Sequence, residues 1–242
     1  MSRTTDDDET IRKRSGWLIP LVVFLVTFAL SALFLLIYLA PNAPSLFQEQ
    51  IAPTSRNDIV ALNVGTRSFY IPANYLEYES ARQGGERREI ALFAMLPDMT
   101  GWSNWEAQTF ADYGVKSPIM ELRIRKDDLN LTEADRLTRV YMGYVVNPLG
   151  IEGPYGLKQY TFRQDSGYHN EDLFVGETSK GILVMRCAHL TADVTSPNCM
   201  RDMPVARGVS LFYRFKRAYL PKWREIGDSV DALIASFEKR PK

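Results

Sequence analysis

The residues best suited to chemistry are two cysteines and a histidine within one short stretch of the sequence. Cys187 and Cys199 are the only cysteines of the chain, twelve positions apart, and His189 follows the first of them closely. The stretch is rich in turn-forming residues and lies between two predicted strands. An even number of cysteines in a domain outside the cytoplasm favours a disulfide. In the chain-entropy model such a bond contributes about 3 kcal/mol to stability, less any strain.

Two other chemistries of these residues remain as alternatives. With His169 as a fourth ligand, the two cysteines and His189 would supply a metal site, although they lack the paired two-residue spacings of structural zinc sites. A cysteine–histidine nucleophile would need a thiolate of low pKa, which the sequence cannot indicate. Cys-x-x-Cys redox and haem-attachment motifs are absent from the sequence. The disulfide is the favoured interpretation.

Recognised catalytic signatures are missing from the rest of the chain. The sequence has no Gly-x-Ser-x-Gly, no His-Glu-x-x-His and no phosphate-binding glycine loop. We therefore predict no catalytic residue, no metal ligand and no cofactor-binding residue.

The charge balance argues against nucleic acid as a partner. Lysine plus arginine and aspartate plus glutamate each number 29, and the first sixteen residues hold four of each sign. The remainder of the chain is therefore balanced as well. A nucleic-acid-binding protein normally carries a basic excess that neutralises phosphates.

An uncharged apolar run near the start predicts a transmembrane helix over residues 17–40. At 1.5 Å per residue the run is about 36 Å long as a helix, enough to cross a hydrocarbon core of about 30 Å. Trp17 and Tyr38 bracket it, as aromatic side chains do at membrane interfaces. The run is too long for the apolar part of a cleaved signal peptide, which indicates a permanent anchor.

Basic residues on one flank predict the orientation of this anchor. Arg12, Lys13 and Arg14 precede it, whereas residues 41–56 carry a single basic residue, Arg56. By the positive-inside rule, residues 1–16 form a cytoplasmic tail and the rest lies outside the cytoplasm. We therefore predict a single-pass protein of the bacterial inner membrane with a periplasmic domain.

The remaining chain predicts a linker followed by one folded domain of the α+β class. Residues 41–57 contain three prolines and read as an extended linker, so the domain should span 58–242. Periodicity predicts strands over 59–64, 67–71, 89–95, 119–125, 156–162, 172–175, 181–186 and 208–215, and helices over 132–146 and 223–239. Because regular alternation of strand and helix is missing, a mainly antiparallel sheet is expected.

Two tryptophans mark the irregular stretch 97–114 between predicted strands. We expect Trp102 and Trp105 to pin this loop to the core, with a ligand-binding platform as the alternative.

The anchor and the missing catalytic motifs together favour a membrane-tethered interaction module, an accessory subunit of a cell-envelope complex. Its expected partners are the lipid bilayer and other envelope proteins. The arrangement of tail, span, linker and outer domain resembles that of accessory proteins of bacterial envelope complexes, a likeness of architecture alone. The alternatives are a small-ligand or lipid-binding domain, and a tethered hydrolase that uses an unrecognised carboxylate or Cys187 with His189.

Overall fold

The computed structural model describes residues 16–39 and 49–240, which fall into two separate units. The first unit contains the helix α1 (Leu18–Leu39), and the second is the domain that begins at Gln50. This start lies ahead of the predicted one at Asp58, because residues next to the linker are tied to the domain. The backbone N–H of Ala52 donates to the carbonyl oxygen of Glu77 at 2.9 Å.

Helix α1 is the one helix of the described residues that is long and apolar enough to cross a membrane. Its bounds agree with the predicted span, and the hydroxyl of Thr27 donates to the carbonyl oxygen of Val23 at 2.8 Å. That bond satisfies one of the few polar groups of the helix internally. Trp17 is exposed just before the helix begins, while Arg12, Lys13 and Arg14 lie outside the described residues.

The domain is built on an antiparallel sheet of eight strands in the order β4-β5-β11-β10-β9-β8-β7-β6, with a smaller sheet β2-β1-β3. The strands are β1 (Ile59–Val64), β2 (Arg67–Pro72), β3 (Gly85–Arg87), β4 (Glu89–Met95), β5 (Ile119–Lys126), β6 (Ile151–Glu152), β7 (Lys158–Thr161), β8 (Glu171–Thr178), β9 (Gly181–Ala188), β10 (Asn198–Ala206) and β11 (Val209–Lys216). The α+β class predicted from the sequence is therefore confirmed.

Helices are few in the domain, and most are single turns. They are η1 (Ala73–Tyr75), η2 (Ser80–Gln83), η3 (Asn104–Glu106), α2 (Ala107–Phe110), α3 (Glu133–Arg136), η4 (Leu137–Tyr141), η5 (Met142–Tyr144), η6 (Pro154–Gly156), η7 (Arg217–Lys222) and α4 (Trp223–Phe237). The helix predicted over 132–146 is broken into α3, the π-helical turn η4 and the 3-10 turn η5. Its predicted start is correct, because Thr132 caps α3.

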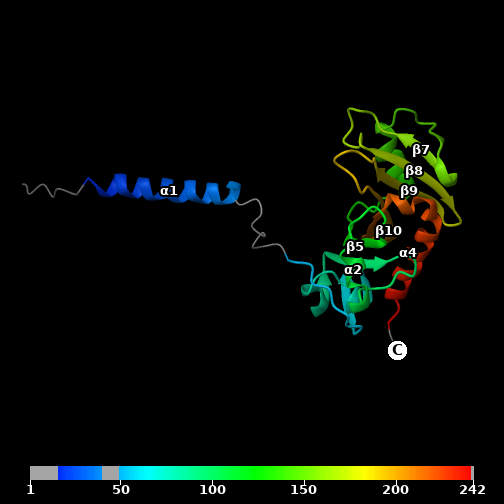
Figure 1. The fold of residues 1–242 in the computed structure, drawn as a ribbon, viewed down its shortest axis with the longest axis horizontal. Helices are drawn as coiled ribbons and strands as arrows, with labels where there is room; N and C mark the ends of the chain where they lie inside the picture. Colours follow the sequence, from blue (N-terminus) through cyan, green and yellow to red (C-terminus); the bar gives the residue numbers. More distant parts are fainter. Residues whose placement is uncertain (1–15, 40–48, 241–242) are drawn as a thin grey trace, which may run out of the picture. The chain divides into compact units, whose positions relative to one another are not determined.

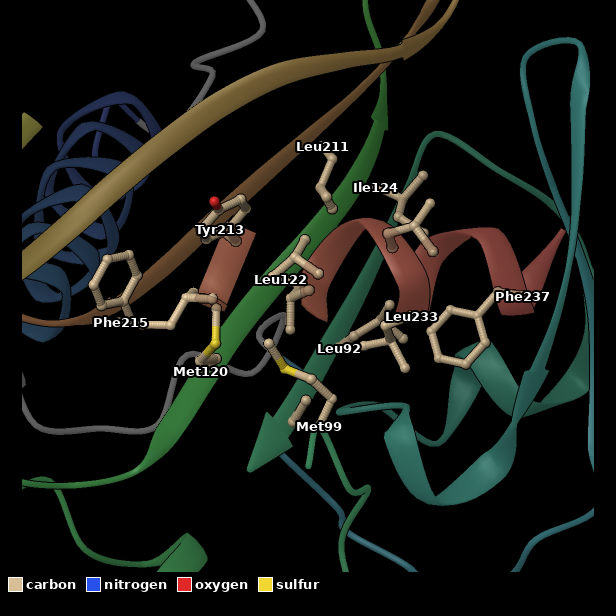
Figure 2. Close-up of a cluster of buried hydrophobic side chains, with 14 of the residues drawn as sticks. Leu92, Met99, Met120, Leu122, Ile124, Leu211, Tyr213, Phe215, Leu233 and Phe237 are labelled. Carbon is tan, nitrogen blue, oxygen red and sulfur yellow. The ribbon is translucent and has the colours of Figure 1, made fainter. Parts of the chain in front are cut away.

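The main core lies on one face of the large sheet. Helix α4 lies against this face (Figure 1), and the hairpin of β1 and β2 contributes to the same cluster. The apolar stripe predicted for the last helix is confirmed, since Val230, Leu233 and Phe237 are buried. Figure 2 shows Leu233 and Phe237 gathered with Leu92 and Leu122 of the sheet.

A second, smaller core lies on the opposite face. On β8, Phe174 belongs to the main core and its neighbour Leu173 to the second one, as alternation along a strand requires. Tyr141 of η4 covers Leu173 and Val184. The sheet is therefore buried on both faces along β8 and β9.

Strand β10 was not expected from the sequence, which predicts turns between Cys187 and Cys199 and no further strand before residue 208. Its polar residues Arg201 and Asp202 interrupt the apolar pattern, and Pro204 lies at a break in the pairing with β11. The polar side chains are tolerated because partners from distant segments satisfy them.

The expectation that both tryptophans of 97–114 pin the loop is wrong for one of them. Trp105 is 96% exposed, at the single turn η3. Trp102 is half-buried, and its backbone N–H donates to the carbonyl oxygen of Asn74 at 2.8 Å. The loop is therefore fixed through Asn74 rather than through two indoles.

Close packing of α4 on β8 predicts a sharp response to one added methyl group. A Cβ at Gly176 would lie 2.5 Å from the ring of Trp223. We expect Gly176→Ala to lower the free energy of unfolding of the full chain in detergent micelles by about 1–3 kcal/mol. Gly143→Ala is the matched control, because a Cβ there meets nothing within 4 Å. Equal denaturation midpoints for the two variants in urea would contradict this packing.

Candidate functional site

The two cysteines form a disulfide between neighbouring strands. Cys187 of β9 and Cys199 of β10 are directly paired across the sheet, and their sulfurs are bonded. Both residues are fully buried in the main core. The bond removes both sulfurs as nucleophile or metal ligands, which excludes the cysteine–histidine hydrolase and the proposed metal site. Within the described residues no other group of three His, Cys, Asp or Glu side chains could hold a metal ion.

His189 belongs to a cluster of hydrogen-bonded and charged side chains around Asp172 of β8. The Asp172 carboxylate lies 3.1 Å from His189 Nε2 and accepts a 2.6 Å hydrogen bond from Arg217 Nη2. Burial raises the pKa of the Asp172 carboxyl, but the bonds from Arg217 and His189 outweigh burial and leave the pKa below its usual value. Arg217 also donates to the carbonyl oxygens of Cys187 and Ala188. This cluster therefore ties η7 to the strands beside the disulfide.

A site that the sequence did not reveal lies on the face opposite α4. It is a polar cavity of about 250 Å³ between the strands and the α3–η4 segment. We call it the arginine pocket, and it is lined by the charged residues Arg125, Arg136, Arg186, Arg201 and Asp202, together with the rings of Tyr141, Tyr168 and Phe212.

Arg201 is the most buried of these cations. Glu133 of α3 reaches the point where β9 and β10 diverge, and its carboxylate accepts from Arg201 Nε at 2.9 Å and Nη2 at 2.7 Å. The same carboxylate accepts a 2.8 Å hydrogen bond from the backbone N–H of Val184. This N–H has no partner on β10, because the two strands no longer pair at Val184. Arg201 Nη1 donates to the hydroxyl of Tyr213 at 3.1 Å. Burial lowers the pKa of Arg201, but the Glu133 hydrogen bonds outweigh it, so the guanidinium stays charged.

Asp202 is shared by two arginines on neighbouring elements. Arg125 Nη2 lies 2.5 Å from one carboxylate oxygen, and Arg136 Nη2 lies 3.4 Å from the other. Burial raises the pKa of Asp202 above its usual value, and the two arginines only partly offset this. Arg136 Nε is buried and has no hydrogen-bond partner within the described part of the chain. A buried donor in this state is normally bonded to water or to a ligand oxygen.

Arg186 is stacked on the aromatic side chains that line one side of the pocket. Its guanidinium lies over the rings of Tyr168 and Tyr141, at 5.0 and 5.7 Å from the ring centroids. Glu171 accepts its Nη1 hydrogen bond at 2.5 Å. A planar guanidinium that is stacked and bonded in this way is held in one orientation.

Counting charges shows what the arginine pocket can bind. Its four guanidiniums face the carboxylates of Asp202, Glu133 and Glu171, and the nearby carboxylate of Asp127 also acts on Asp202. Positive and negative charges are therefore balanced, and within the described residues the donor Arg136 Nε and the acceptor Asp202 Oδ1 are both buried without a hydrogen-bond partner. Arginine forks match the geometry of carboxylate and phosphate oxygens. Arg136 Nε and the partly exposed guanidiniums of Arg125 and Arg186 therefore offer hydrogen-bond donors to an oxyanion.

The sequence could not have revealed this pocket. Its arginines are spread over strands β5, β9 and β10 and over α3, and each one alone is typical of a solvated face. Only the alternation of β5 was a signal. Alternation places Arg125 on the face opposite the buried Leu122 and Ile124.

One solved structure has a similar fold. It is described as an immunity protein of the Stenotrophomonas maltophilia type IV secretion system, with a TM-score of 0.54 and 16% sequence identity. The likeness covers 76% of this chain and 94% of that chain. At this identity it shows a shared fold alone. No protein-family model and no curated protein sequence matches the chain.

The buried pair of Glu133 and Arg201 gives a stability prediction. Glu133→Gln keeps the shape of the side chain but leaves the guanidinium without its counter-charge, so we expect a loss of about 3–5 kcal/mol in the free energy of unfolding. Urea unfolding followed by near-ultraviolet circular dichroism measures this. Asp165→Asn is the control, because its ion pair with Arg163 is exposed, and a change of at most about 1 kcal/mol is expected. A Glu133→Gln midpoint that matches the control would contradict the role of this pair.

Proposed function

We propose that the protein is a membrane-tethered module that binds another protein of the cell envelope, and that the arginine pocket receives an acidic side chain of that partner. In this proposal residues 1–16 are cytoplasmic, residues 17–40 span the inner membrane, and the domain lies in the periplasm. The buried donor Arg136 Nε, which has no hydrogen-bond partner within the described residues, carries the proposal, together with the partly exposed guanidiniums of Arg125 and Arg186.

The composition of the pocket supports a protein partner. Arginine and tyrosine are enriched among the residues that dominate binding energy at protein interfaces, especially in desolvated concave sites. Arg125 and Arg186 are partly exposed in the pocket, beside Tyr168. An acidic side chain that enters would bond to guanidiniums already held in place, which reduces the ordering cost of association.

The anchor supports the same function. A tether confines the domain to one membrane surface and raises its effective concentration toward partners held there, without any new contact. A modest affinity in the arginine pocket then suffices for occupancy.

The shared fold gives further support of a weaker kind. Immunity proteins as a class act by binding other proteins, and some of the tightest known complexes are of this kind. A domain with such a fold is suited to presenting a binding surface, although fold by itself does not fix function.

Photocrosslinking tests the pocket as the contact surface. We expect benzoylphenylalanine at Tyr168 to give a specific crosslinked adduct in native membranes, identified by mass spectrometry. Tyr155 is the matched control position. It is exposed, and its carbonyl oxygen bonds to Trp223 Nε1 on the α4 side. We expect Arg125→Gln to weaken the Tyr168 adduct about tenfold, because charge-assisted hydrogen bonds are lost. Arg67→Gln, on an exposed arginine of strand β2, should leave it unchanged.

Two outcomes would overturn this assignment. One is an adduct from Tyr155 as strong as that from Tyr168, which would place the contact elsewhere. The other is recovery of the chain as a monomer from both positions.

The orientation is tested by a reporter fusion. Alkaline phosphatase folds only where its disulfides can form, so we expect an active enzyme when it follows Lys242. Replacing Arg12, Lys13 and Arg14 by alanine removes the basic flank and should lower this activity. A fluorescent cytoplasmic reporter at Lys242, with an inactive phosphatase, would contradict a periplasmic domain.

A further inference from the structure

A second cavity lies on the same face of the sheet, toward the other end of β5. It has a volume of about 290 Å³ and a mostly apolar lining. We call it the aromatic groove, and the residues that define it are Phe93, Trp102, Phe110, Tyr113, Glu77 and Glu121. Trp102 thus lines a concave site, as expected if its loop forms the ligand-binding platform that was the alternative prediction from the sequence.

The backbone of Glu77 is fixed on both sides of the residue by hydrogen bonds to neighbouring segments. Its N–H donates to the carbonyl oxygen of Ala91 at 3.1 Å, and its own carbonyl oxygen accepts from Ala52. The residue is only 2% exposed. Its ion pair is long, with Arg123 Nη2 at 3.5 Å, and Arg123 is shared with Glu89. A buried carboxylate is thus incompletely compensated.

The charges that face Glu77 leave a negative excess. The carboxylates of Glu77, Glu89 and Glu121 meet the guanidiniums of Arg123 and Arg214. Adding the next pair, Asp112 and Lys216, leaves the excess unchanged. Burial raises the pKa of Glu77 to about 7, although Arg123 opposes this. A cation in the groove would compensate the carboxylate that the protein leaves short of positive charge.

We propose that the aromatic groove binds a small organic cation, an ammonium group on an aromatic or alkyl stem. The stem lies among the rings of Phe93, Phe110 and Tyr113, which attract a cation through their faces as well as burying apolar surface. The ammonium group lies beside Glu77 and Glu121. An anion is repelled by both carboxylates. A neutral apolar ligand brings no positive charge to compensate the buried carboxylate of Glu77. This site is separate from the arginine pocket, so the proposal holds whether or not that pocket binds a protein.

The test compares three probes on the full chain in detergent micelles by saturation-transfer NMR. They are 2-phenylethylammonium, the neutral 2-phenylethanol and the anionic 3-phenylpropanoate. We expect the ammonium probe to bind about tenfold tighter than the alcohol at pH 8, because a charge-assisted hydrogen bond replaces a neutral one. The propanoate should not compete. At pH 5.5 Glu77 is protonated while the amine stays charged, so the preference for the ammonium probe should decline.

Variants separate this site from partition of the probes into micelles. Glu77→Gln should abolish both the preference for ammonium and its dependence on pH. Glu152→Gln removes the same charge from exposed strand β6 and should change neither. Phe110→Ala removes one wall and should weaken ammonium and alcohol alike, which keeps the test decisive if Glu77→Gln does not fold. Equal binding of ammonium and alcohol to the wild-type chain, or an unchanged preference in folded Glu77→Gln, would overturn the proposal.

Discussion

The domain depends on one buried ion pair that crosses a gap in its sheet. Strands β9 and β10 pair only from Cys187 and Cys199 to Met185 and Arg201, and beyond that point they diverge. The Glu133 carboxylate bridges the gap by accepting hydrogen bonds from Arg201 and from the backbone N–H of Val184. Because Glu133 begins α3, the same contact fixes the turn that covers the second core and forms one wall of the arginine pocket. The disulfide holds the two strands together at the other end of this short ladder, two residues from where the gap begins.

The two faces of the sheet differ in structure: one is packed against α4, and the other carries the two cavities. The face under α4 is filled mostly by apolar side chains, with the Arg201–Tyr213 hydrogen bond beneath Gly227, and it stabilises the fold. The opposite face carries both cavities, and the alternation of β5 places them in one row. Glu121 lines the aromatic groove, Arg123 lies between, and Arg125 lines the arginine pocket. At about 3.3 Å per residue the two ends of this row are roughly 13 Å apart. One half-buried strand face therefore contributes side chains to both cavities.

Much of the scaffold, but neither cavity, could be predicted from the sequence. Local patterns predicted α1, the strand of Leu122 and the helix of Val230, because period and apolar spacing are contained within each segment. The arginine pocket depends on contacts between residues far apart in the chain, such as Arg125 with Asp202 and Arg201 with Glu133. Strand β10 was missed for the same reason. Its polar side chains look unsuited to a half-buried strand until their distant partners are known.

The carboxylates that neutralise the charges of the arginine pocket affect which ligands it can recognise. Arg125 and Arg186 are each bonded to a carboxylate of the protein, so an incoming oxyanion competes with groups already present. Such a site adds less to affinity than to specificity and orientation, because a misplaced anion meets Asp202 instead of a guanidinium. Weak but selective contacts suffice when both partners are confined to one membrane surface. In the proposed tethered arrangement, a nearly neutralised pocket is therefore better suited to selecting among neighbouring membrane proteins than to binding a dilute ligand from solution.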